Sequence, residues 1–197
     1  MANKKLIIWD FDGPIVDSRK LALEFTQHQY HNVSENLHRN LFNRNIFTEL
    51  AKLKKKDISE AEVDLFLESS YWPRKLELPP VEGIKVVLEA LQADFQLVIN
   101  SSSLTPQIHN YLEKNKLRSL FQKIYGNEIK SKEEKFKLIL EDFADIFHIP
   151  SIVVLWGYQL KAHFASIADR VVFVKRPSEL LTAIKTHFSV LKPATII

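Results

Sequence analysis

Two aspartates, Asp10 and Asp12, lie one residue apart directly after the short apolar run from Leu6 to Trp9. A continuous apolar run of this kind is typical of a strand that is buried on both faces of a parallel sheet. Gly13 follows and allows the backbone to turn away sharply. Because ligands bind just beyond the carboxyl ends of strands in open α/β sheets, we expect both carboxylates to lie where chemistry is done. The alternative is that they only end a strand and cap a turn.

A second polar group follows a second apolar run. Residues 95–99 predict another buried strand, which ends at four consecutive polar residues, Asn100, Ser101, Ser102 and Ser103. A hydroxyl at the end of a strand, ahead of a helix, can hold a phosphate together with backbone N–H groups. Ser and Asn are also common turn formers, so this group by itself leaves both interpretations open.

Residues 10–13, Asp-Phe-Asp-Gly, resemble the first motif of the haloacid dehalogenase-like hydrolase superfamily, and residues 17–18, Asp-Ser, extend the match toward its phosphoglycolate phosphatase-like members. The resemblance runs over residues 6–174. It implies that Asp10 is the nucleophile, which attacks phosphorus and forms an aspartyl phosphate. It implies that Asp12 is the acid/base, which protonates the leaving oxygen and later deprotonates the attacking water. Mg²⁺ is the implied cofactor, with Asp10 and the backbone carbonyl of Asp12 as ligands.

The resemblance also implies residues that bind the phosphoryl group. Ser101 matches the second motif, a hydroxyl that hydrogen-bonds this group, and Asn100 takes its place if the alignment is off by one residue. The third motif is a neutralising lysine, although a lysine in so basic a segment is more often a solvated charge. Lys132 and Lys135 both lie at a suitable distance, and we prefer Lys132 because it precedes the expected helix. The expected substrate-binding residues are Gly13, Ser102, Asn100 and Lys135.

The fourth motif departs from the superfamily pattern. After the apolar run that ends in Trp156, the superfamily has Gly-Asp and a second Asp four positions later, and these acids ligate magnesium or support its ligands. Here Gly157 is followed by Tyr158, and Ala162 stands at the second position. Losing even a residue that supports a metal ligand typically costs about 10- to 100-fold in metal affinity or activity, so we expect a weakened magnesium site.

Strand-like runs alternate with helical periodicity along most of the chain. The expected strands are residues 6–9, 95–99, 123–125, 152–156 and 171–174. Strands that alternate with helices predict an α/β fold, a Rossmann-like three-layer α/β/α parallel sheet.

Residues 19–78 contain no convincing strand. Helical periodicity predicts three helices here, over residues 19–30, 35–53 and 59–70. Ser59 and Glu62 form a capping-box pattern at the start of the third helix. In the resembling superfamily an all-helical insertion at this place is a cap, which closes over the active site. The expected domains are a core of residues 1–18 and 79–197 and a helical cap of residues 19–78.

The composition excludes several classes of protein and site. The chain of 197 residues has no cysteine, which excludes disulfides, thiolate metal sites and cysteine nucleophiles. No apolar run approaches the roughly 20 residues that span a bilayer, and the N-terminal run is too short for a signal peptide, so we expect a cytoplasmic protein. The net charge is only +3, and the basic run at residues 52–56 is best explained as a solvated helix end. We therefore expect a small phosphorylated metabolite as partner, and neither nucleic acid nor membrane.

Two functions fit these observations. The first is a phosphatase that hydrolyses a small phosphomonoester through an aspartyl phosphate with Mg²⁺. Asp12 favours phosphoryl transfer over carbon–halogen cleavage, because the dehalogenase branch does not use a second Asp as an acid/base. The alternative is a catalytically weak or inactive member that binds a phosphorylated ligand or a protein partner, which Tyr158 and Ala162 favour. The sequence names neither the substrate nor the oligomeric state.

Overall fold

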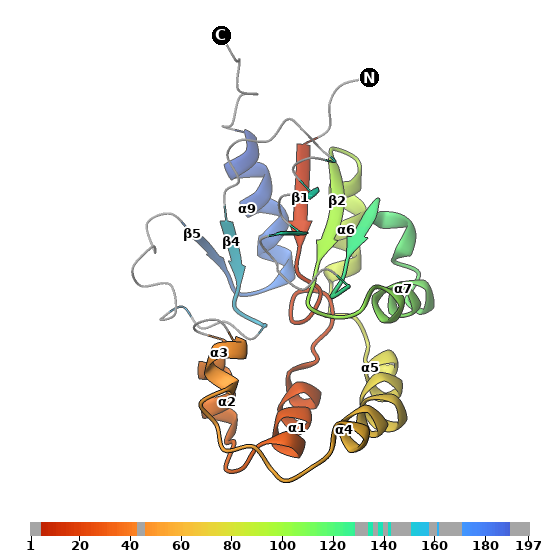
Figure 1. Ribbon diagram of the computed structural model, residues 1–197. Coiled ribbons are helices and arrows are strands. Elements are labelled where there is room, and N and C mark those ends of the chain that lie inside the picture. Colours follow the sequence, from red (N-terminus) through yellow and green to blue (C-terminus); the bar gives the residue numbers. More distant parts are fainter. Residues whose placement is uncertain are drawn as a thin grey trace.

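The computed structural model describes residues 5–42, 46–128, 134–135, 138–139, 142, 151–157, 161 and 171–189. Each described strand runs parallel to its hydrogen-bonded neighbour. β1 (Lys5–Trp9), β2 (Phe95–Asn100) and β3 (Lys123–Tyr125) form one sheet in the order β1-β2-β3. β4 (Ser151–Val154) and β5 (Val171–Val174) form a second parallel pair (Figure 1). These strands overlap the apolar runs from which they are predicted, although β4 ends at Val154, two residues before the predicted end at Trp156.

The predicted α/β class is confirmed, and the strand pairing differs in one respect from the single sheet that the sequence predicts. In the part of the chain that the structure describes, no backbone pairing joins β1 to β4. The two sets of strands meet instead through side chains, because Trp9 belongs to the apolar cluster against which Ile152 and Val154 pack. A shared hydrophobic core therefore supports both sets.

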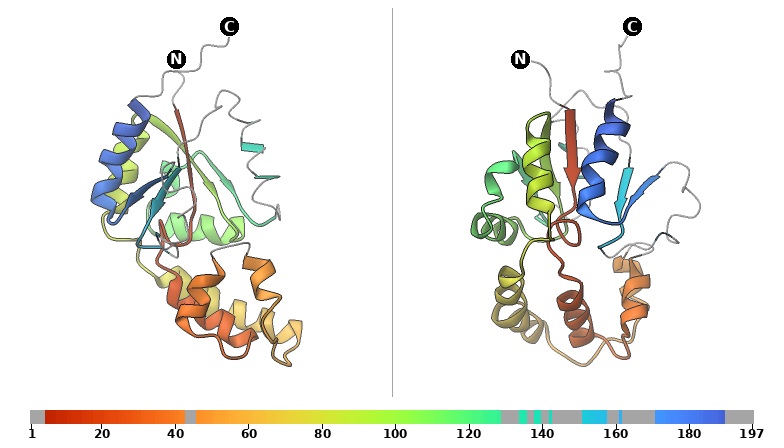
Figure 2. Two further views of the ribbon diagram at one scale, coloured as in Figure 1. Left: turned by 90° about the vertical axis from the view of Figure 1, so that its left-hand side faces the viewer. Right: turned by 180° about the vertical axis from the view of Figure 1, so that it is seen from behind.

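Helices and helical residues cover the strands on both faces. The helices of this part are α6 (Ile84–Gln92), α7 (Thr105–Lys114), the short 3-10 helix η2 (Arg118–Leu120) and α9 (Pro177–Ser189). α6 and α9 contact each other on one face (Figure 2), where Ile7 and Trp9 pack with the main cluster. Leu6 and Ile8 point to the opposite face and pack with the helical residue Ile139. This alternation along β1 gives the three layers expected of a buried parallel strand.

The chain between β1 and α6 forms a group of helices, called the helical segment (residues 19–78) below. Its members are α1 (Arg19–Gln29), α2 (Glu35–Leu41), α3 (Ile46–Leu50), α4 (Glu60–Phe66), the π-helix η1 (Leu67–Tyr71) and α5 (Trp72–Glu77). They lie beyond the carboxyl ends of β1 and β2 (Figure 1). The single helix predicted over residues 35–53 is wrong, because α2 and α3 are separate helices. Among the described helices, none combines the length and apolar character needed to cross a bilayer.

Two stretches of chain connect the helical segment to the strands, and they pair with each other. Val16 forms an antiparallel bridge with Pro80. The N–H of Val81 donates to the carbonyl of Ile15, with 2.9 Å between nitrogen and oxygen. The second stretch then enters α6 through Gly83, whose φ of +79° is a left-handed conformation that favours glycine. The division of the chain into core and cap domains at these points stays a prediction.

Candidate active site

Asp10 and Asp12 follow the end of β1, as the sequence predicts, but they lie in different surroundings. Asp10 is exposed, and its Oδ1 accepts a hydrogen bond from the N–H of Phe11 at 2.8 Å. Phe11 is buried, and its ring packs edge-on against Tyr111 with 5.3 Å between ring centroids. This contact anchors the loop after β1, so both carboxylates are held at the edge of the sheet.

The turn after Asp12 brings a second loop to the site. Gly13 has a φ of +99°, and its N–H donates to the carbonyl of Val16 at 2.8 Å. A Cβ added to Gly157 would lie 3.4 Å from the Cα of Gly13, so the loop after β4 packs directly against this turn. Gly157 aligns the fourth motif, which therefore begins beside the aspartates. Tyr158 and Ala162 lie outside the described residues.

The Asp12 carboxylate has partners from three separate parts of the chain. Ser18, at the start of α1, donates from Oγ to Asp12 Oδ1 at 2.6 Å. Ser103, in the loop after β2, donates from Oγ to Oδ2 at 2.7 Å. Lys75, in α5, places Nζ 2.6 Å from Oδ1. Both oxygens of Asp12 are therefore engaged, and one of the three partners, Lys75, comes from the helical segment.

Lys75 is a buried lysine, with only 5% of its side chain exposed. Its Nζ also donates to Ser103 Oγ at 2.9 Å. Three aromatic rings surround the ammonium, with centroids 5.1, 5.7 and 5.3 Å from Nζ for Phe11, Tyr71 and Trp72. The partially negative faces of aromatic rings attract a cation, so these three rings stabilise the buried ammonium in addition to Asp12.

The Lys75 ammonium determines the charge state of Asp12. Burial alone would raise the pKa of Asp12, but the nearby Lys75 charge and the hydrogen bonds to the carboxylate outweigh it and hold this pKa below its ordinary value. Burial, and then the negative charge of Asp12, raise the pKa of Tyr71 and of Tyr111 above their ordinary values. Asp12 is therefore a carboxylate at neutral pH, and both tyrosines are neutral.

The loop after β2 also reaches the site. Asn100 is the last residue of β2 and pairs with Tyr125 in the strand ladder. Ser101 is fully buried, and its Oγ accepts a hydrogen bond from the N–H of Ser103 at 3.0 Å. Ser102 is exposed. Ser101 is thus the first residue beyond the strand, which matches the alignment preferred from the sequence, while the phosphate-binding role of these residues stays a prediction.

One of the two candidate lysines can be placed. Lys135 is fully buried, and its ammonium donates to the backbone carbonyl of Ser101. It therefore reaches the loop that carries the second motif. Lys132, which the sequence favours, lies outside the described residues, so the choice between the two stays open.

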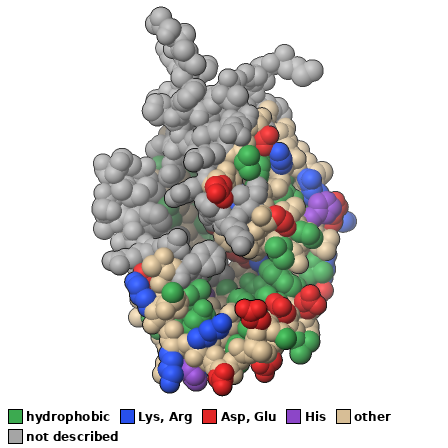
Figure 3. Space-filling view, viewed as in Figure 1, with side chains coloured by type: hydrophobic (Ala, Val, Ile, Leu, Met, Phe, Trp, Pro, Cys, Tyr) green, Lys and Arg blue, Asp and Glu red, His purple; other side chains and the backbone are tan. Residues whose placement is uncertain are grey.

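The helical segment faces the strand ends across a hollow (Figure 3). Hydrophobic side chains gather on the segment just below this hollow. Phe25 of α1 contributes to the segment's own aromatic cluster, with its ring 5.2 Å from that of Tyr71 and 6.2 Å from that of Phe66. This cluster joins α1, α4 and η1, and its member Tyr71 also contacts Lys75.

Comparison of the chain with models of protein families shows its family. Residues 7–144 match the family model of the haloacid dehalogenase-like hydrolases, which covers more than half of the chain. The chain belongs to this hydrolase family. The resemblance inferred from residues 10–13 is thereby confirmed, and Asp10 and Asp12 lie within the matched residues.

Solved structures of haloacid dehalogenase-like hydrolases share the fold. A member from Streptococcus pneumoniae has a TM-score of 0.71 at 18% identity, over 93% of this chain and 100% of the other. A predicted phosphoglycolate phosphatase from Haemophilus somnus has a TM-score of 0.67 at 21% identity, over 93% and 99%. A Bacillus subtilis member, bound to magnesium and described as revealing interdomain movement, has a TM-score of 0.56 at 14% identity, over 93% and 99%. At these identities the likeness shows the fold, and no curated protein matches the chain.

The haloacid dehalogenase-like site offers few oxygen ligands for a metal. Asp10 supplies an exposed carboxylate and Asp12 a backbone carbonyl, whereas the Asp12 carboxylate is engaged by its three partners. Within the described ranges, no three His, Cys, Asp or Glu side chains gather closely enough to hold an ion. Mg²⁺ commonly keeps several waters and binds one or two carboxylates together with substrate phosphates. The Asp10 carboxylate and the Asp12 backbone carbonyl therefore fit a magnesium ion that keeps several of its waters.

The sequence analysis missed the three residues that contact the Asp12 carboxylate. Ser18 and Ser103 lie inside the polar stretches that carry the first and second motifs, so their hydroxyls were available candidates. Lys75 lies beyond the end of the helix predicted over residues 59–70, and no local signal marks it as buried.

Proposed function

We propose that the protein is a phosphatase of the haloacid dehalogenase-like family that hydrolyses a small phosphomonoester through an aspartyl phosphate on Asp10. The observation that carries this proposal is the contrast between the two carboxylates at the end of β1. Asp10 is exposed and can meet a substrate, whereas Asp12 is held by Ser18, Ser103 and Lys75. A nucleophile must be accessible to the substrate, whereas an acid/base must be held in a fixed position beside it.

The reaction has two halves. In the first, a carboxylate oxygen of Asp10 attacks phosphorus, the bond from phosphorus to the ester oxygen breaks, and that oxygen takes a proton from Asp12. In the second, water attacks the phosphorus of the aspartyl phosphate, Asp12 accepts the proton, and inorganic phosphate leaves as Asp10 is restored. The carboxylate form of Asp12, which its surroundings favour, is the form that the second half requires. The proton that Asp12 accepts there is the one that it gives to the leaving oxygen in the next turnover. Ser101 and Lys135, which contact each other, are the residues that we propose to bind the phosphoryl group.

Magnesium is the proposed cofactor, held by the Asp10 carboxylate and the Asp12 backbone carbonyl. When bound, it offsets the repulsion between Asp10 and the phosphate dianion. The magnesium bound to the Bacillus subtilis relative supports this proposal. Because Tyr158 and Ala162 replace the expected acids, we expect a higher magnesium requirement than an intact fourth motif would give.

The helical segment is proposed to act as the cap of this enzyme. It lies beyond the strand ends and contributes Lys75 to the surroundings of Asp12. A segment in this place contacts the leaving group rather than the phosphate, and so it selects the substrate.

The test is hydrolysis of 4-nitrophenyl phosphate with and without Mg²⁺ by the native protein, Asp10→Asn and a matched control. Asp17→Asn serves as the control, because Asp17 is an exposed aspartate of the same loop that pairs with Arg19. We expect magnesium-dependent turnover in the native protein and in Asp17→Asn, and none in Asp10→Asn. A phosphorylated protein trapped by acid quenching and absent from Asp10→Asn would identify the intermediate.

A second candidate function rests on the missing acids of the fourth motif. A protein without turnover that is still stabilised against heat by inorganic phosphate would be a binding protein on a phosphatase fold. Absence of both turnover and magnesium-dependent stabilisation in the native protein would refute the phosphatase proposal.

A further inference from the structure

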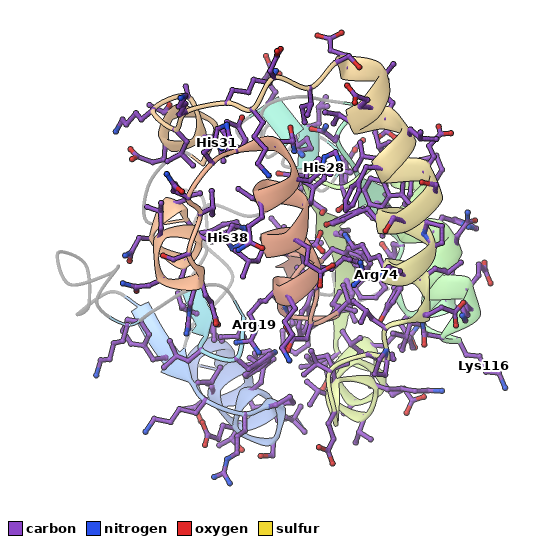
Figure 4. The ribbon with its side chains drawn as sticks, turned by 90° about the horizontal axis from the view of Figure 1, so that it is seen from below. Arg19, His28, His31, His38, Arg74 and Lys116 are labelled. Atoms are coloured by element: carbon purple, nitrogen blue, oxygen red, sulfur yellow. The ribbon has the colours of Figure 1, made fainter. Side chains whose placement is uncertain are left out.

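The contact between Lys75 and Asp12 joins the helical segment to the strands. Nζ of Lys75 lies 2.6 Å from Asp12 Oδ1, and only 5% of the lysine side chain is exposed. The neighbouring cation behaves differently. Arg74 has 52% of its side chain exposed and pairs with Glu24 at 2.6 Å, between α5 and α1 (Figure 4). Arg74 and Lys75 are adjacent on α5, and of these two only Lys75 points into the site.

The backbone before α5 aims Lys75 at the site. In η1 the N–H of Trp72 donates to the carbonyl of Leu67, which is the wider repeat of a π-helix. Pro73 follows and has no N–H to continue an α-helical ladder. Single π-turns within helices occur frequently at functional sites. Tyr71 and Lys75, four positions apart, then face the same side, with Nζ 5.7 Å from the Tyr71 ring centroid.

A purely structural role would not favour a lysine here. Replacing a buried ion pair by apolar side chains of similar size is often neutral or stabilising, because burying two charges costs free energy. The lysine is already surrounded by the rings of Phe11, Tyr71 and Trp72, against which an apolar side chain would pack well. A charge at this position therefore points to a role toward Asp12.

The direction of the Asp12 carboxylate depends on Lys75. The ammonium contacts Oδ1 directly and Ser103 Oγ at 2.9 Å, and this hydroxyl in turn donates to Oδ2. Lys75 thus influences both oxygens, one directly and one through Ser103. Without it, Oδ1 keeps the Ser18 hydroxyl, and the Ser103 hydroxyl loses the donor that orients it.

We propose that Lys75 is a positioning residue for the acid/base step. From α5 it fixes the direction in which the Asp12 carboxylate faces, and so it makes leaving-group protonation depend on how the helical segment sits against the strands. The inference rests on the proposed phosphatase function. A displacement of about 1 Å in a reacting group can cost about 100-fold in rate, which sets the size of the expected effect.

The experiment compares the native protein with Lys75→Met, Lys75→Arg and Arg74→Met on esters of different leaving groups. The series contains aryl phosphates whose phenols span a range of pKa and one alkyl phosphate. Esters with poor leaving groups depend on protonation by Asp12, whereas 4-nitrophenyl phosphate depends on it little.

We expect Lys75→Met to lower kcat on the alkyl phosphate by about 10- to 100-fold more than on 4-nitrophenyl phosphate, with KM changed little. Lys75→Arg should recover part of this loss, and Arg74→Met should behave as the native protein. Equal losses on all esters, a change confined to KM, or no loss would each overturn the proposal. Should Lys75→Met fail to fold, Lys75→Gln replaces it, since it keeps a hydrogen-bond donor without the charge.

A double-mutant cycle in urea unfolding tests the contact without reference to activity. The cycle compares Asp12→Asn, Lys75→Met and the double variant with the native protein. Each variant changes the unfolding equilibrium constant by some factor. We expect the factor for the double variant to be about tenfold smaller than the product of the two single factors. Multiplicative effects would overturn the contact and the proposal together. A native protein with no turnover would overturn the phosphatase function and the catalytic role of Lys75, and the cycle would then report the ion pair alone.

Discussion

Asp10 and Asp12 are two residues apart, yet the fold gives them opposite environments. Asp10 is exposed at the strand end, whereas Asp12 turns toward Ser18, Ser103 and Lys75. The buried Phe11 between them separates the two environments. At the scale of single residues, the site therefore combines an exposed carboxylate, Asp10, with one that is held by side chains from other parts of the chain, Asp12.

The lowered pKa of Asp12 predicts how stability depends on pH. A carboxyl whose folded pKa lies below its unfolded pKa stabilises the fold above the unfolded pKa and loses this contribution as the pH falls through the folded pKa. The ordinary pKa of this group is 3.8, so the contribution of Asp12 is present at neutral pH and declines below about pH 4. Urea unfolding between pH 3 and 7 should show a steeper acid loss for the native protein than for Asp12→Asn. Parallel curves would contradict this prediction.

At the scale of elements, the segment from α4 through η1 to α5 is continuous and has two distinct ends. Its first turn is fixed by local side chains, because the Glu62 N–H donates to Ser59 Oγ at 3.2 Å and the Ser59 N–H donates to Glu62 Oε2 at 2.8 Å. Its last turn is fixed by the distant contact of Lys75 with Asp12. The segment is therefore anchored locally where it begins and by tertiary contacts where it meets the site.

Ser59→Ala should destabilise the start of α4. Replacing a serine N-cap by alanine typically costs about 0.5–2 kcal/mol, because an N–H of the first turn loses its acceptor. Ser69→Ala is the matched control, since Ser69 Oγ donates to the carbonyl of Leu65 within the helix and supports no cap. Urea unfolding should show a loss for Ser59→Ala and little change for Ser69→Ala; equal effects would mean that the cap carries no special stability.

The same segment shows which features can be predicted from the sequence. The capping box is predictable because both partners lie within one turn of helix. The strands that end at Asp10 and Ser101 are predictable for the same reason, since an apolar run followed by polar residues is a local pattern. The inward turn of Lys75 is not, because it depends on a π-turn and on partners in β1's loop and the loop after β2. The break between α2 and α3 was missed because helical periodicity continues across it.

At the scale of the whole molecule, charged contacts between the helical segment and the strand-bearing part are of unequal weight. Lys114 of α7 pairs with Glu77 of α5 at 2.5 Å, but both side chains are largely exposed, and exposed pairs contribute about 0–1 kcal/mol. Lys75 and Asp12 form the more buried pair. Of these two contacts, the pair of Lys75 and Asp12 therefore has the greater weight in holding the helical segment against the strands.

The paired connections at Val16 and Pro80 have a mechanical consequence. Shear between the two connections would break the hydrogen bond from Val81 to Ile15, whereas bending both connections together would not. We therefore expect the helical segment to rotate about one hinge axis rather than to twist. Since the chain has no cysteine, introduced cysteines can carry spin labels in pairs, one on α6 and the other on α2 or on α4. In Figure 1, α2 and α4 flank α1. When orthovanadate is added, the distance from α6 to α2 and the distance from α6 to α4 should change in the same direction. A twist would instead lengthen one of these distances and shorten the other.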